Sequence, residues 1–224
     1  MKFIDLGLDE RILEGIDAMG YENATPVQQQ VMVPILEGKD IIAAAQTGTG
    51  KTAAFLLPLL HRLLTIPHTA GDINAMVIVP TRELAIQIAD NMEGLGYFTN
   101  VSCIAVYGGG DGNSFTAEKT ALTSGCDIVV CTPGRMIAHL NMGYVNLKEV
   151  KYLVLDEADR MLDMGFQDEL MKIISFLAPT RQNLLFSATM PHKMRELARK
   201  LLTDPVEINI AVSKPPEQIV QNAF

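Results

Sequence analysis

The octapeptide AQTGTGKT at residues 45–52 follows an apolar run and leads into a helical pattern. Small residues at Ala45, Gly48 and Gly50 allow backbone N–H groups to wrap around an anion, and the positive end of the following helix would point at it. Ala45 stands where the usual G-x-x-x-x-G-K-[ST] pattern has its first glycine. A glycine-rich turn with a surface lysine is the alternative, but the strand–loop–helix context favours a phosphate cradle.

The same loop carries side chains suited to a triphosphate. Lys51 can reach the β- and γ-phosphates, and the Thr52 hydroxyl can ligate Mg²⁺. The other loop positions complete the expected contact set: Gln46, Thr47 and Thr49. The sequence therefore predicts a nucleoside triphosphate site.

A second group of reactive side chains lies in VLDEAD, residues 154–159, at the end of an apolar run. Asp156 is suited to hold Mg²⁺ through water, because Mg²⁺ keeps several waters and takes few carboxylates. Glu157 is placed to orient or deprotonate an attacking water. Acids that merely cap the next helix are the alternative. Beside a phosphate loop, the magnesium and water-activating roles are favoured.

The elements that would position these residues alternate between strands and helices. Helical periodicity marks residues 167–177 and 191–202, and a helix is expected to start near Lys51. The apolar runs between helical patterns are mostly continuous, as in strands buried on both faces of a parallel sheet. These runs are residues 40–45, 75–80, 102–108, 127–131, 152–156, 183–187 and 206–210. The alternation predicts a doubly wound α/β domain, whose ligands bind outside the carboxyl ends of the strands.

Composition is that of a globular protein. The chain has 224 residues, of which 48% are hydrophobic and 20% charged. No apolar run reaches the roughly 18 residues that would indicate a membrane span, and we expect a cytoplasmic protein. The net charge of −8 argues against a strong nucleic-acid binder, because affinity for a phosphate backbone comes largely from Lys and Arg.

Six short motifs follow one another along the chain: AQTGTGKT, PTRELA (80–85), GG (109–110), TPGR (132–135), DEAD (156–159) and SAT (187–189). In order and approximate spacing they resemble the DEAD-box family of ATP-dependent RNA helicases, from Phe3 to about Asn209. The resemblance implies a RecA-like P-loop NTPase fold, with a mostly parallel sheet and helices on both faces. It also implies ATP and Mg²⁺ as cofactors and RNA as a partner.

The segment GYENATPVQ at residues 20–28 resembles the adenine-reading Q motif of that family. By resemblance, Gln28 would hydrogen-bond the adenine edge, Tyr21 would stack on the ring, and Phe3 would buttress that stack. Thr25 and Gln28 also form a good capping box for the helix that follows. Gln28 could serve in both ways, since its amide offers a donor and an acceptor.

Three further motifs combine small residues with hydroxyl or guanidinium groups. By resemblance they line one track along the sugar-phosphate backbone of single-stranded RNA. The residues are Pro80, Thr81, Arg82, Gly109, Gly110, Thr132, Pro133, Gly134 and Arg135. Taken singly, each motif is a common loop, and Thr81 is also a plausible helix cap. The segment after Gly110 is slightly longer than the family pattern.

The SAT motif follows an apolar run, and its Ser187 and Thr189 hydroxyls could hydrogen-bond Asp159. By resemblance, this contact would link the hydrolysis site to the RNA side. Helix capping next to Pro191 is the alternative for Thr189.

We expect residues 1–210 to form one ATP-binding domain, with 1–36 as its Q-motif region and 211–224 as the start of a linker. By resemblance, a C-terminal RecA-like domain would follow and supply arginine fingers, which are worth about 10³–10⁵ in rate. The present half would then bind ATP and RNA backbone but be nearly inactive alone. We expect a monomer whose partners are RNA and that second domain, with no membrane contact.

Two other functions stay open at this point. A DNA helicase or translocase would use the same ATP-driven machinery, although the tetrad ending in Asp159 and the adenine-reading segment favour RNA. A non-catalytic ATP-gated RNA clamp would bind without turnover. Glu157 argues against such a clamp, because a pure binder needs no water-activating carboxylate.

Overall fold

A computed structural model describes residues 1–46, 48–68, 71–110 and 112–210. Within these residues, seven strands pair in parallel in the order β3-β4-β2-β5-β6-β1-β7. Each of the seven predicted apolar runs overlaps one strand, which confirms the parallel sheet. The strands are Ile41–Ala44 (β1), Ala75–Ile78 (β2), Cys103–Val106 (β3), Ile128–Cys131 (β4), Tyr152–Leu155 (β5), Gln182–Ser187 (β6) and Val206–Asn209 (β7).

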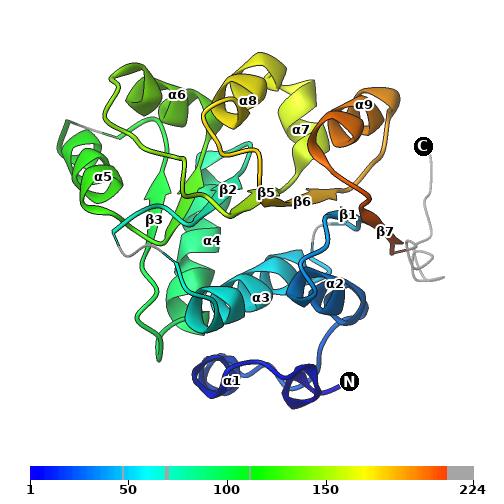
Figure 1. Cartoon of the computed structure of the whole chain (residues 1–224). Helices are drawn as coiled ribbons and strands as arrows, with labels where there is room; N and C mark the ends of the chain where they lie inside the picture. Colours follow the sequence, from blue (N-terminus) through cyan, green and yellow to red (C-terminus); the bar gives the residue numbers. More distant parts are fainter. Residues whose placement is uncertain (47, 69–70, 111, 211–224) are drawn as a thin grey trace, which may run out of the picture.

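Helices lie on both sides of this sheet (Figure 1). A short 3₁₀ helix, η1 (Phe3–Leu6), precedes them, and one side carries α1 (Glu10–Ala18), α2 (Pro26–Leu36), α3 (Lys51–Thr65) and α4 (Arg82–Leu95). The other side carries α5 (Gly112–Ser124), α6 (Pro133–Asn141), α7 (Ala158–Asp163), α8 (Gln167–Ile174) and α9 (His192–Leu201). Two buried apolar clusters fill the two interfaces, as a doubly wound α/β fold requires. In the described part of the chain, no helix is both long and apolar enough to cross a membrane.

The strand order sorts the sequence motifs into two neighbouring groups. The adjacent strands β3, β4 and β2 lead into the GG, TPGR and PTRELA motifs, whereas β5, β6 and β1 lead into the DEAD, SAT and AQTGTGKT motifs. Because all strands are parallel, these six loops lie along the same edge of the sheet. The fold thus places the acidic motif and the phosphate loop on either side of the SAT strand β6, and the three predicted RNA motifs beside one another.

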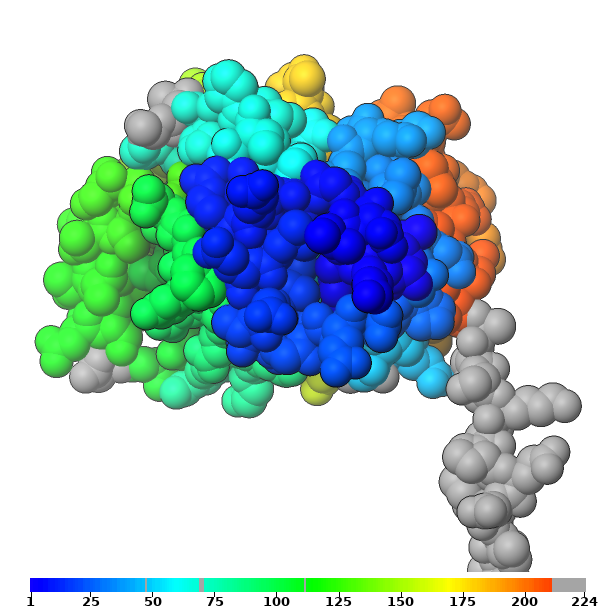
Figure 2. Space-filling view, turned by 90° about the horizontal axis from the view of Figure 1, so that it is seen from below, coloured from blue at the N-terminus to red at the C-terminus, as the bar shows by residue number. Residues whose placement is uncertain are grey.

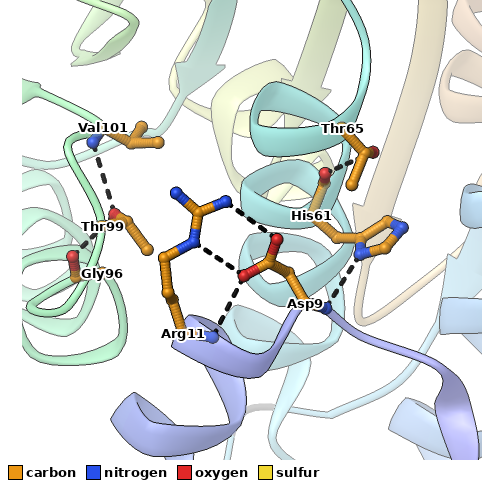
Figure 3. A network of polar contacts seen from close by, with 7 residues as sticks. All are labelled: Asp9, Arg11, His61, Thr65, Gly96, Thr99 and Val101. Atoms are coloured by element: carbon orange, nitrogen blue, oxygen red, sulfur yellow. Dashed lines mark hydrogen bonds and ion pairs between the residues drawn. The ribbon is translucent and has the colours of Figure 1, made fainter.

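The N-terminal segment packs across α3 and α4 and covers the centre of that face of the molecule (Figure 2). Asp9 caps α1 by accepting the Arg11 N–H at 3.0 Å and also pairs with the Arg11 guanidinium (Figure 3). The Asp9 N–H donates to His61 Nδ1 of α3 at 3.1 Å. Gly15 of α1 lies so close to α4 that a Cβ there would be 2.2 Å from the Leu95 carbonyl oxygen. These contacts fix α1, and with it the segment leading to Tyr21.

The His61 contact should make the docking of α1 sensitive to pH. Burial lowers the pKa of His61, because a partly desolvated imidazole resists charging, although Asp9 opposes this shift. Nδ1 must be unprotonated to accept the Asp9 N–H, so this stabilisation is present above the ordinary histidine pKa of about 6.5. It is lost as the pH falls from there through the lowered folded-state pKa.

We expect the free energy of unfolding of the wild type, measured with urea, to be lower at pH 5 than at pH 7.5 because of this loss. His61→Asn keeps an acceptor near the position of Nδ1 but does not titrate, so its stability should fall less between the two pH values. Equal losses in both proteins would contradict the assignment to His61.

Candidate functional site

A cavity of about 520 Å³ opens at the carboxyl edge of the sheet, where the N-terminal segment, the phosphate loop, α4 and the end of β5 meet. Its walls include most residues that the sequence placed around a triphosphate. These are Phe3, Tyr21, Gln28, Gly48, Gly50, Lys51, Thr52, Asp156 and Glu157. The predicted loop residue Thr47 lies outside the described residues. The fold therefore gathers three distant segments around one pocket.

The phosphate loop is built for close approach of its backbone to a ligand. Gly50 is the N-cap residue of α3 and has a left-handed φ of 91°, a conformation that favours glycine. Because glycine has no side chain, Gly50 cannot cap the helix with a hydrogen bond. A Cβ at Gly50 would lie 2.7 Å from Gln28 Nε2. No side chain in the described part of the chain caps the first N–H groups of α3, which suits an anion at this end of the cavity.

Lys51 is buried, and its Nζ donates to the Ala45 carbonyl oxygen at 2.8 Å. Ala45, which stands in place of the first glycine of the pattern, therefore binds Lys51 through its main-chain carbonyl. The methyl side chain of Ala45 does not interfere with this contact. Gln46 is exposed, and its carbonyl accepts the Thr49 hydroxyl at 2.8 Å. These two contacts tie the two ends of the loop together.

Asp156 and Glu157 differ sharply in environment. Burial raises the pKa of Asp156 to about 6, although Lys51 and the Glu157 N–H, 2.9 Å from Oδ1, favour the ionised form. Glu157 is less buried and has the unusual left-handed φ of 50° for a non-glycine residue. Its carboxylate pairs with Arg160 at 3.1 Å. A buried carboxylate that is costly to ionise is stabilised by a cation beside it. Both Asp156 and Glu157 line the cavity.

Gln28 makes the capping box and contacts the phosphate loop as well. Its Oε1 accepts the Thr25 N–H at 2.8 Å, its own N–H donates to Thr25 Oγ1 at 3.4 Å, and its Nε2 donates to the Gly50 carbonyl at 3.1 Å. The capping alternative is thus confirmed. Tyr21 and Phe3 stack with ring centroids 6.5 Å apart, and Phe3 is the buried member. Phe3 supports Tyr21 as predicted, and contact with adenine stays a prediction.

The sequence reading missed one wall of the cavity. Leu84, Gln87 and Asn91 of α4 line it at intervals of three and four residues. This spacing places them on one face of the helix. The periodicity could have identified the face, but not that it turns toward the phosphate loop. Arg160, the partner of Glu157, was also missed.

The PTRELA and GG motifs touch each other. Thr81 caps α4 by accepting the Leu84 N–H at 3.3 Å, and Pro80 lies buried just before it. The Arg82 guanidinium lies 5.0 Å from the centre of the Tyr107 ring, and Nη1 donates to the Gly109 carbonyl at 3.4 Å. Gly110 follows directly, against Ser114 of α5. The predicted Thr81 cap is confirmed, and among the described residues its hydroxyl hydrogen meets no acceptor and could donate to a ligand.

The TPGR motif begins α6. Thr132 is the N-cap residue, yet its side chain makes no capping hydrogen bond, and Pro133 occupies the first helical position. Gly134 has open space where a side chain would be. Arg135 is largely buried, and its Nε donates to Glu118 at 2.7 Å. The helix start is therefore free to meet an anion, whereas the Arg135 guanidinium is engaged by α5.

The SAT motif is hydrogen-bonded to the acidic motif. Asp159 Oδ2 accepts both the Thr189 hydroxyl, at 2.7 Å, and the Thr189 N–H, at 2.9 Å. Burial opposes ionisation of Asp159, but hydrogen bonds, led by the one from the Thr189 hydroxyl, outweigh it, so the pKa of Asp159 is lowered. Ser187 Oγ also donates to the Thr189 carbonyl at 2.6 Å. The predicted hydrogen bond from the Thr189 hydroxyl to Asp159 is present, whereas the Ser187 hydroxyl reaches Asp159 only by way of Thr189. Capping by Thr189 is wrong because Pro191 is the N-cap of α9.

The all-parallel sheet, the glycine loop before α3 and the acids after β5 together define a RecA-like P-loop protein. Comparison with known proteins narrows this class. The chain belongs to the DEAD/DEAH box helicase family, whose sequence model matches residues 25–197.

Similar proteins come from distant organisms. The chain is 43% identical to ATP-dependent RNA helicase CshA of Listeria monocytogenes, over 100% of this chain and 42% of that protein. It is also 43% identical to DEAD-box ATP-dependent RNA helicase RhpA of Helicobacter pylori, over 94% of this chain and 42% of that protein. A crystal structure of a DEAD box protein from Methanococcus jannaschii superimposes with a TM-score of 0.86 at 41% identity, covering 93% of this chain and 56% of that one. The chain thus spans less than half the length of these curated relatives.

Proposed function

We propose that this chain is the ATP-binding half of an ATP-dependent RNA helicase. It would bind ATP–Mg²⁺ and the backbone of single-stranded RNA, and hydrolysis in the full-length protein would drive local unwinding of an RNA duplex. The observation that carries the proposal is the single cavity that unites Lys51 and Thr52 of the glycine loop with Asp156 and Glu157. The names of CshA and RhpA describe RNA helicases, which supports RNA over DNA as the substrate.

The residues present fit a magnesium–triphosphate. The uncapped start of α3 and Lys51 offer positive groups to the phosphates. Thr52 and Asp156 would hold the metal, and the cost of burying the Asp156 carboxylate explains why a cation belongs beside it. Bound there, Mg²⁺ would neutralise charge on the phosphate oxygens. Gln28 and Tyr21 would contact the adenine, while Phe3 supports Tyr21.

Hydrolysis needs a group that orients water and takes its proton. Glu157 has the required chemistry and lines the same cavity as Lys51. Asp159 would transmit the state of this site to the RNA side through Ser187 and Thr189. The three loops beyond β2, β3 and β4 would hold the RNA backbone, with hydroxyls and helix N-termini facing phosphates.

The second RecA-like domain would supply the arginine fingers and the other wall of the ATP site. The isolated chain should therefore bind nucleotide but turn it over far more slowly than the full-length protein. Because affinity linkage is reciprocal, ATP and RNA should strengthen each other's binding in the full-length protein.

Nucleotide affinity of Lys51→Ala in the full-length protein tests the proposal. Losing one charge-assisted contact should weaken ATP binding by about 10- to 100-fold. Lys39→Ala removes an exposed lysine outside the cavity and should leave the affinity unchanged. Wild-type turnover should rise on adding RNA, and the same titration with the 224-residue chain should show almost no rise. An unchanged ATP affinity in Lys51→Ala, or no response of the wild type to RNA, would contradict the proposal.

A further inference from the structure

Glu118 of α5 is a buried carboxylate shared by two of the loops that carry predicted RNA contacts. Its Oε1 accepts the backbone N–H of Tyr107, at the start of the GG loop, at 3.3 Å. Its Oε2 accepts from Arg135 Nε and His139 Nε2 of α6, each at 2.7 Å. Glu118 and His139 are 4% and 0% exposed. One side chain therefore holds the end of β3 and the first two turns of α6 together.

Aromatic rings complete this buried group. The Arg135 guanidinium carbon lies 4.6 Å from the centre of the Phe115 ring, and the His139 ring stacks on Phe115 with centroids 4.3 Å apart. The Tyr144 hydroxyl meets His139 Nδ1, so a neutral imidazole can accept there and still donate from Nε2 to Glu118. Arg135 Nη2 is buried and makes no hydrogen bond to any residue that the structure describes. The charge of Arg135 is thus balanced chiefly by Glu118.

The same contacts reach α4. Arg82 lies over the ring of Tyr107, whose backbone N–H is bound by Glu118, and Arg82 also donates to the Gly109 carbonyl. A continuous chain of contacts therefore joins the PTRELA, GG and TPGR loops. Weak contacts to one RNA strand act together only if the loops that make them are held in fixed relative positions, to within about 0.5 Å for a preorganised site.

We propose that Glu118 and His139 are positioning residues that set the RNA-binding geometry of the GG and TPGR loops without touching RNA themselves. The proposal rests on the function proposed above and deepens it. Glu118 fixes the backbone just before Gly108–Gly110, and with His139 it fixes the helix whose free N-terminus begins at Thr132. Arg135 is the link through which the carboxylate acts on the TPGR turn, because its Nε is bonded to Glu118 and its plane packs on Phe115.

The test compares full-length variants by the RNA concentration that gives half-maximal stimulation of ATP hydrolysis. Glu118→Gln keeps the size and one acceptor but loses the charge, so Arg135 and His139 no longer share a carboxylate. Half-maximal stimulation should then need about ten-fold more RNA, the size expected for losing a hydrogen bond to a charged group. The KM for ATP at saturating RNA should stay at the wild-type value, because neither Glu118 nor its partners Arg135 and His139 line the ATP cavity.

Variants of His139 distinguish a positioning role from a general loss of stability. His139→Gln retains an N–H that can reach Glu118 and should stay near the wild-type RNA requirement, whereas His139→Leu should approach Glu118→Gln. Asp40→Asn is the matched control, because Asp40 is also a buried carboxylate but accepts from Asn183 and Thr203 at the opposite edge of the sheet. Its thermal midpoint should fall while its RNA requirement stays constant.

An unchanged RNA requirement in Glu118→Gln would overturn the proposal, as would an equal shift in Asp40→Asn. Equal behaviour of His139→Gln and His139→Leu would overturn the role of His139. If the wild-type full-length protein itself fails to respond to RNA, the proposed function falls. If RNA stimulates the wild type and Glu118→Gln needs no more RNA than the wild type, the positioning role is rejected while the proposed function stands.

Discussion

Full-length protein carrying Glu157→Gln is expected to hydrolyse ATP about 10²–10⁴ times more slowly than the wild type while still binding ATP. Glutamine has the shape of glutamate and can still orient a water by hydrogen bonding, but it cannot take the proton. Glu157 stands at a left-handed backbone position beside the buried Asp156, so its carboxylate lines the cavity without being buried as deeply. Steady-state turnover at saturating RNA, together with equilibrium ATP binding, measures the two effects separately.

Arg160 provides the matched comparison for Glu157. It pairs with Glu157 at 3.1 Å but is more than half exposed, so the pair contributes little stability. Arg160→Ala leaves the carboxylate in place and should reduce turnover far less than Glu157→Gln. Glu93 is an exposed carboxylate of α4 outside the cavity, so Glu93→Gln should leave turnover unchanged. Turnover that survives in Glu157→Gln would remove the assigned role and revive the ATP-gated clamp as the better description.

The sheet could be predicted because its strands are local features of the sequence. Most strands are continuous apolar runs, and the inner strands β2, β4 and β5 are buried on both faces. The parallel topology alone brings the ends of β1 and β5, with Ala45 and Asp156, to one edge of the sheet. Helix ends were less predictable. The helix expected over residues 167–177 ends at Ile174 although Leu177 is buried, because apolar periodicity reports burial and not the point where the backbone leaves the helix.

Side-chain partners across the fold could not be predicted in the same way. The sequence leaves open whether Gln28 caps α2 or faces a ligand. Only the folded chain shows that its Nε2 also reaches Gly50, 22 residues away. Glu118 and His139 lie in ordinary helical patterns, and their shared contacts depend on how α5 packs against α6. Long-range polar contacts of this kind follow from tertiary packing, which neither periodicity nor motif spacing encodes.

Asp156→Asn is expected to stabilise the nucleotide-free protein at neutral pH and to abolish its stabilisation by ATP with Mg²⁺. Burial raises the pKa of Asp156 from 3.8 to about 6, so the folded state holds this proton more tightly than the unfolded state does. Stability from this group is therefore full below about pH 4 and is lost as the pH rises through 6. At pH 7.5 the ionised carboxylate costs the folded state roughly 3 kcal/mol, at about 1.4 kcal/mol per pKa unit.

Asparagine removes this cost and keeps an oxygen that can accept the Glu157 N–H, as Oδ1 does at 2.9 Å. Urea unfolding without ligand should show Asp156→Asn to be the more stable protein at pH 7.5, with the gain vanishing at pH 4. Asp40→Asn should instead be destabilised, because Asp40 is held by three N–H donors and gains nothing from losing its charge.

Adding ATP with Mg²⁺ should raise the thermal midpoint of the wild type, since a ligand that binds only the folded state stabilises it by mass action. The same addition should leave Asp156→Asn nearly unchanged, because a neutral amide does not replace a carboxylate as a partner of Mg²⁺. A variant that is less stable than wild type at pH 7.5, or one that still responds fully to ATP with Mg²⁺, would contradict this account. Together the two results would mean that the protein gives up stability at Asp156 in order to keep a place for the metal.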